Sequence, residues 1–91
     1  MSSAAFSGMD IGQVRQFATQ LGQRASEIDT LLQQLTNQLS STTWQGPDAT
    51  QFRNDWQSTH ATALRNVANA LRDAQNKAST NATEQENTSA R

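Results

Sequence analysis

An unbroken seven-residue repeat of apolar side chains dominates the first half of the chain. The repeat advances in alternating steps of three and four residues over about four heptads, which is the spacing of one face of an α-helix. Its members are Ile11, Val14, Ala18, Leu21, Ala25, Ile28, Leu32, Leu35 and Leu39. A β-strand alternates with a period of two, so the pattern excludes a strand and predicts one long amphipathic helix.

The ends of this helix have recognisable signals and place it at about residues 10–41. Asp10, followed three residues later by Gln13, resembles a capping box at the start of a helix. The four hydroxyl residues at 40–43 favour turns and caps over helix interiors, so the helix is expected to end there. Gly22 lies inside the repeat, where the missing side chain is either simply tolerated or allows another helix to approach closely.

A Trp-Gln-Gly-Pro segment then separates this helix from a second one. Pro47 disfavours helix at the residue before it but fits the first turn of a new helix. The sequence therefore predicts a turn at 42–46, with Trp44, Gly46 and Pro47 as its motif. Trp44 either anchors the ends of the two helices or serves as a docking handle for a partner.

The second helix is expected at about residues 47–79. Its apolar positions are Ala49, Phe52, Trp56, His60, Ala63, Val67, Ala70 and Ala74, with Leu64 and Leu71 beside them. The step of four residues from Trp56 to His60 departs from the strict heptad phase.

Two long helices joined by a short turn pack as an antiparallel hairpin, so the predicted fold is all-α, with one helical hairpin at residues 10–79. A hairpin covers only one side of each apolar stripe, and we therefore expect two hairpins to pair into a four-helix bundle dimer. The side chains expected in this dimer interface are Val14, Phe17, Leu21, Ile28, Leu32, Leu35, Leu39, Phe52, Trp56, His60 and Val67. Residues 1–9 are expected to form a flexible lead-in, and residues 80–91, which lack large apolar side chains, a disordered tail.

Composition argues against several functions. Seven basic and eight acidic side chains give a net charge of −1, which does not suit binding to nucleic acid through its phosphates. The chain has no cysteine, its carboxylates lack metal-ligand spacing, and His60 has no acid placed to orient it, so we expect neither an enzyme nor a metal or cofactor. No apolar stretch is long enough to cross a membrane, and residues 1–8 do not resemble a cleavable signal peptide.

The Trp-Gln-Gly tripeptide at 44–46, between two helices of similar length in a polar chain, resembles the turn of the WXG100 family (ESAT-6-like proteins). Ala49, Phe52 and Trp56 are similar to the small and aromatic residues that enter the second helix in that family, and the resemblance covers about residues 8–86. It implies export from bacteria by a type VII (ESX) secretion system, without a cleaved signal, as a folded dimer. The implied partners are a second copy or another WXG100 protein, and the secretion ATPase. The implied location is secreted or on the cell surface.

In this family an export signal, tyrosine followed four residues later by an acid, lies after the second helix. The nearest register here has the acid at Glu86 but alanine at Ala82, and the chain contains no tyrosine. This degenerate signal suggests that a partner supplies the complete one. Three other functions stay open: an intracellular adaptor that delivers a larger toxin to the secretion system, a non-secreted coiled-coil module, and a membrane-active effector.

Overall fold

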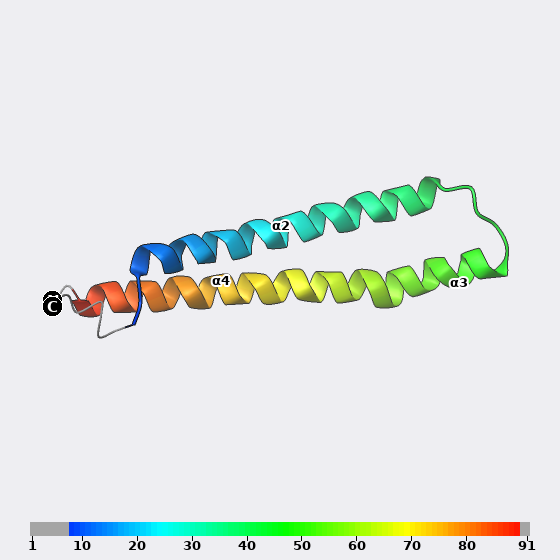
Figure 1. Ribbon diagram of the computed structural model, residues 1–91. Coiled ribbons are helices and arrows are strands. Elements are labelled where there is room, and N and C mark those ends of the chain that lie inside the picture. The colour runs from blue at the N-terminus through cyan, green and yellow to red at the C-terminus, as the bar shows by residue number, and fades with distance from the viewer. Residues whose placement is uncertain (1–7, 90–91) are drawn as a thin grey trace.

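The computed structural model describes residues 8–89, and over that range the protein is a helical hairpin (Figure 1). Helix α2 spans Ile11–Ser41. The second arm consists of α3 (Pro47–Asp55), a π-helical turn η1 (Trp56–His60) and α4 (Ala61–Ser89), and it bends where η1 interrupts it. The all-α hairpin predicted from the sequence is confirmed. Residues 1–7 of the expected lead-in and 90–91 of the expected tail lie outside the described residues.

Helix α2 begins and ends where the sequence predicts, because side chains satisfy its terminal backbone groups. The Asp10 carboxylate accepts a hydrogen bond from the backbone N–H of Gln13 at 3.0 Å, which satisfies a donor that the helix leaves unpaired. At the other end, the Thr42 hydroxyl donates to the carbonyl of Gln38 at 2.7 Å and the Thr42 N–H donates to the carbonyl of Leu39 at 3.2 Å. These bonds end the helix at Ser41.

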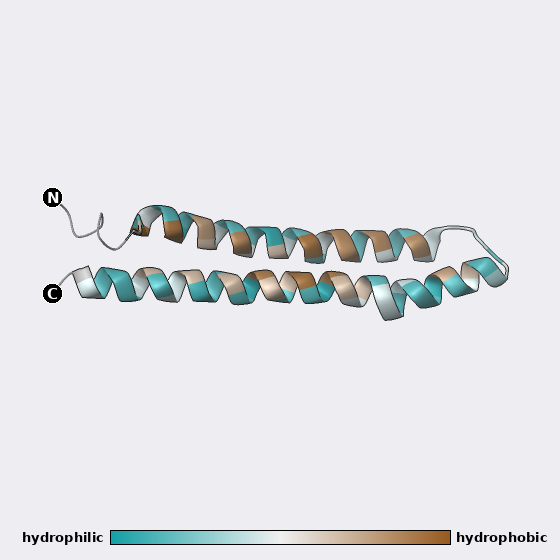
Figure 2. Cartoon of the chain, turned by 60° about the horizontal axis from the view of Figure 1, so that its bottom comes forward, coloured by the Kyte–Doolittle hydropathy of each residue, from teal (hydrophilic) through white to brown (hydrophobic). Residues whose placement is uncertain are grey.

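The contact between the two arms is made mainly by alanine. We use the term seam for the buried residues of α2 and α4: Ala18, Ala25, Leu32, Ala61, Ala68 and Ala82; Ala49 of α3 is also buried. Five larger members of the predicted repeat in α2 are half-buried beside the seam: Ile11, Val14, Leu21, Ile28 and Leu39. Figure 2 shows hydrophobic residues along the sides of the helices that face each other. The predicted inward face of α2 is therefore correct, except that Leu35 is 44% exposed.

The predicted inward face of α4 is wrong by one residue. His60, Ala63, Val67, Ala70 and Ala74 are all exposed. The positions that pack against α2 are the next ones along the chain: Ala61, Leu64, Ala68, Leu71 and Gln75.

The π-helical turn η1 causes this shift. The backbone N–H of Ala61 donates to the carbonyl of Trp56, five residues earlier, and such a turn holds one residue more than an α-helical turn. Each later position is therefore rotated by about 100° about the helix axis. The step from Trp56 to the next inward residue is five, whereas the sequence suggested four.

Helix α4 extends ten residues beyond its predicted end at 79, because α2 packs against its last turns. Ala82 is fully buried against the other arm. A guanidinium nitrogen of Arg15 in α2 lies 3.0 Å from a carboxylate oxygen of Glu86 and 3.4 Å from the hydroxyl of Thr83. The expectation of a disordered tail is therefore wrong for residues 80–89.

Gly22 permits a close approach between the arms, which is the sharper of its two interpretations. A Cβ atom at this position would lie 2.6 Å from the side-chain oxygen of Gln75. The missing side chain thus makes room for the Gln75 amide against α2.

Among residues 8–89, no helix has an apolar run of the length that crossing a bilayer requires.

Two adjacent leucines test whether the seam stabilises the hairpin. Leu32 is 6% exposed, whereas Leu31 is 54% exposed. We expect Leu32→Ala to lower the free energy of unfolding by about 2 kcal/mol or more, because it leaves a cavity between the arms. The matched change Leu31→Ala should cost only about 0.5 kcal/mol in the isolated hairpin. Urea denaturation followed by circular dichroism at low protein concentration measures both, and equal losses would contradict this assignment of the seam.

Candidate partner-binding site at the turn

The turn between the arms depends on the backbone freedom of glycine. Gly46 has φ 109° and ψ 175°, a region that essentially only glycine occupies. Pro47 follows as the first residue of α3, where its fixed φ suits the helix and its missing N–H removes no hydrogen bond. Asp48 lies in the same first turn, near the positive end of the helix dipole. The turn thus falls at 42–46 as predicted, with Gly46 and Pro47 in the expected places.

Arg53 holds the turn in shape, a role that the sequence analysis missed. One guanidinium nitrogen donates to the carbonyl of Trp44 at 2.8 Å, and another donates to the carbonyl of Thr42 at 3.0 Å. Both carbonyls lie beyond the end of α2, where no helical N–H is available to them. No sequence motif marks contacts between a side chain and loop carbonyls. Only the presence of a cationic residue shortly after the turn could have suggested this role.

The aromatic residues of the turn remain accessible. The rings of Trp44 and Phe52 lie with centroids 5.2 Å apart and planes tilted by 50°. Their side chains are nevertheless 39% and 43% exposed. Trp44 therefore packs on the start of the second arm while leaving much of its surface free, which is compatible with both roles considered for it.

Trp56 fixes the second arm to the first at the level of η1. Its indole N–H donates to the hydroxyl oxygen of Thr36 in α2 at 2.9 Å. The centroid of the indole ring lies 6.2 Å from the centroid of the His60 ring. His60 itself is exposed and does not lie on the face that packs against α2, in contrast to the prediction.

An open, mainly apolar groove of about 240 Å³ lies between α2 and the beginning of the second arm. Its walls are Leu35, Leu39, Phe52 and Trp56, with Gln38 and Thr42 at its edge. The groove brings together four of the residues predicted for the dimer interface, from both arms of the hairpin.

Further along the hairpin, other large apolar side chains are exposed on the same side. We use the term apolar flank for Phe17, Leu31, Leu35 and Val67, whose exposed fractions are 60%, 54%, 44% and 48%. Three of them immediately precede seam residues, and Leu35 precedes the half-buried Thr36. In an antiparallel pair of right-handed helices, residues that directly precede inward-facing positions point to one common side of the pair, whichever helix they belong to. The flank therefore forms one face of the hairpin, continuous with the groove at Leu35.

The residues predicted for the dimer interface thus fall into three groups. Phe17, Leu35, Phe52, His60 and Val67 are exposed, and Val14, Leu21, Ile28, Leu39 and Trp56 are half-buried. Leu32 is buried within a single hairpin, so it cannot be a main contact to a partner. Leu31, which was not in the predicted interface, is well exposed on the flank.

The two residues that were predicted to form a degenerate export signal lie in α4 and not in a free tail. Ala82 is buried against α2, and Glu86 forms an ion pair with Arg15.

Within residues 8–89, no cluster of three histidine or acidic side chains is arranged to hold a metal ion. No protein-family model, curated protein or solved structure matches the chain.

The backbone of Gly46 predicts a clear asymmetry between two glycine substitutions. Gly46→Ala should destabilise the hairpin by about 1–3 kcal/mol, because alanine does not tolerate this conformation. Gly12→Ala, inside α2, where the new methyl group would meet only an ordinary 3.5 Å contact, should stabilise it by about 0.5–1 kcal/mol. Thermal and urea unfolding of both variants measure these changes. If Gly46→Ala were neutral, the turn would not require the observed backbone geometry.

Proposed function

We propose that this chain is a small WXG100-type protein that a type VII (ESX) secretion system exports from bacteria as a folded dimer, and that it acts through protein–protein interaction. The observation that carries the proposal is a Trp-x-Gly turn between two long antiparallel helices whose apolar flank stays exposed. The residues and spacing of this turn are those that resemble the family.

The exposed apolar flank supports a partner that completes the core. Phe17, Leu31, Leu35 and Val67 each keep about half of their surface in water. Burying the remainder would contribute on the order of 1 kcal/mol for each side chain, and the contribution doubles in a two-fold symmetric pair. Placing two flanks together produces a four-helix bundle, either from identical chains or from this chain and another WXG100 protein.

The position of the degenerate signal supports dependence on a partner for export. Ala82 offers no aromatic side chain and is turned inward, and the carboxylate of Glu86 is held by Arg15. In a heterodimer, the second chain carries the complete tyrosine-acid signal and brings this chain to the secretion ATPase.

The same observation favours a second candidate function. A hairpin with an apolar flank and no complete signal of its own suits an intracellular adaptor, which binds the helical domain of a larger toxin and delivers it to the secretion system. The two functions use the same flank and differ in whether this chain leaves the cell.

We expect polar substitutions on the flank to dissociate the dimer without unfolding the hairpin. The double variant Leu31→Gln with Leu35→Gln removes exposed apolar surface while keeping residues that favour helix. Gln34→Ala, at an exposed position between them, is the matched control. Light scattering after size-exclusion chromatography should show a dimer, alone or with a co-expressed partner, for the wild type and the control and a monomer for the double variant. A monomeric wild type that binds no partner would refute the proposed assembly.

Export can be measured with a tagged chain in cells that possess a type VII system. We expect the chain in the culture medium only when both the secretion ATPase and a second WXG100 protein are present. If it stays in the cell while a toxin requires it for export, the adaptor function is correct instead. Efficient secretion from cells that lack every other WXG100 protein would contradict the proposed need for a partner's signal.

A further inference from the structure

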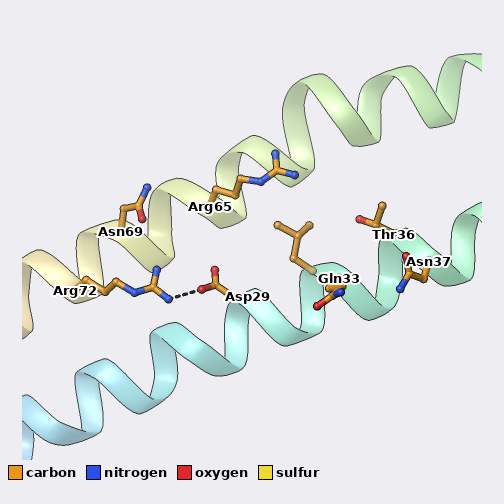
Figure 3. A pocket seen from close by; sticks show the side chains of 8 residues that line it. Asp29, Gln33, Thr36, Asn37, Arg65, Asn69 and Arg72 are labelled. Carbon is orange, nitrogen blue, oxygen red and sulfur yellow. Dashed lines mark hydrogen bonds and ion pairs between the residues drawn. The ribbon is translucent and has the colours of Figure 1, made fainter.

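A cleft lined mainly by polar side chains lies beside the seam (Figure 3). It has a volume of about 490 Å³ and lies between α2 and α4. The polar residues that line it, including Gln33, Arg65 and Asn69, mostly come directly after inward positions, whereas the flank residues come directly before them. The cleft and the flank are therefore separate surfaces.

The charges in the cleft leave one cation without a counterion. Arg72 is paired with Asp29 across the two helices, as Figure 3 shows. Arg65 lies two turns away on the same face of α4 and makes neither a hydrogen bond nor an ion pair with any residue in 8–88. By contrast, Arg15 and Arg24 each hold a carboxylate, and Arg53 holds two carbonyls. The lining thus carries a single uncompensated positive charge.

Neutral hydrogen-bond donors line the same cleft as this cation. The amides of Gln33 and Asn37 in α2 and of Asn69 in α4 line the same cleft and make no hydrogen bonds within residues 8–88. The oxygen of the Thr36 hydroxyl already accepts from Trp56, which leaves the hydroxyl proton available to an acceptor in the cleft. A guanidinium group in a cleft that also offers amide donors suits an anionic oxygen acceptor, and the fork geometry of the guanidinium matches a carboxylate.

We propose that this cleft binds the carboxylate of an acidic side chain presented by a protein partner. One uncompensated positive charge matches a monoanion, whereas a phosphate dianion would keep one negative charge without a counterion in the cleft. The cleft is open to solvent, where a lone ion pair contributes little affinity. The carboxylate is therefore part of a larger contact along the polar face, and this contact leaves the flank free for a second partner.

The test is a titration of the full chain, labelled with ¹⁵N, with a blocked peptide that carries several glutamates. A peptide of the same sequence with glutamine at those positions is the matched ligand control. We expect the Arg65 side-chain resonance and the amides of Gln33 and Asn69 to shift and saturate with the glutamate peptide only. At equal ionic strength, sodium acetate should give the same pattern more weakly, and inorganic phosphate should not exceed acetate.

Variants of the chain separate a specific site from general charge attraction. Arg65→Gln should weaken binding of the glutamate peptide about threefold, and Arg65→Lys, which keeps the charge but not the fork, should bind with an affinity between that of Arg65→Gln and that of the wild type. Arg24→Gln, at an exposed position away from the cleft, should bind as the wild type does. Circular dichroism should show an unchanged hairpin in each variant. The proposal would be overturned if Arg65→Gln bound the glutamate peptide as the wild type does. Resonance shifts of equal size at Arg24 and Arg65, or binding of phosphate more tightly than acetate, would overturn it as well.

Discussion

The alanine contact between the two arms determines most other properties of this hairpin. Alanine loses no side-chain entropy in a helix and allows two helices to approach closely, but each alanine buries little apolar surface. Between arms that meet through Ala18, Ala25, Ala61 and Ala68, only Leu32 is buried among the large described side chains of α2. The other large apolar side chains are displaced to the edges, where they are half-buried or exposed. A close but thin contact of this kind holds the hairpin together and leaves apolar surface for a partner.

The two sides of the hairpin differ because helical geometry turns a one-residue offset into a change of face. The residues before inward positions include Phe17, Leu31 and Val67, whereas those after them include Gln33 and Asn69. In an antiparallel pair, the residues that precede inward positions lie on one side in both helices, and the residues that follow them lie on the other side. One side is therefore apolar and the other polar, although neither arm alone has a long uniform stripe of either kind. This division is the reason for assigning the two faces to different partners.

The sequence predicts helix α2 and the turn well because both depend on local signals. The regular repeat, the cap at Asp10 and the Gly46-Pro47 pair each act within a few residues. The inward face of α4 is not predicted, because alanines lie both at the true inward positions and one residue away from several of them, so the apolar pattern does not reveal the extra residue of η1. The helix beyond residue 79 and the Arg53 contacts depend on residues brought together only by folding.

The π-helical turn reconciles two requirements that a regular helix cannot satisfy together. Trp56 must face α2 to donate its N–H to Thr36, and the residues from Ala61 onward must present their alanines to the same helix. In a continuous α-helix with Trp56 facing inward, the next inward positions would be His60, Ala63 and Val67, as the spacing suggests. Val67 would then be buried and lost from the flank, and the polar residues of the cleft would rotate with it. The single extra residue in η1 thus keeps the groove at the turn, the seam and both outer faces in register along one hairpin.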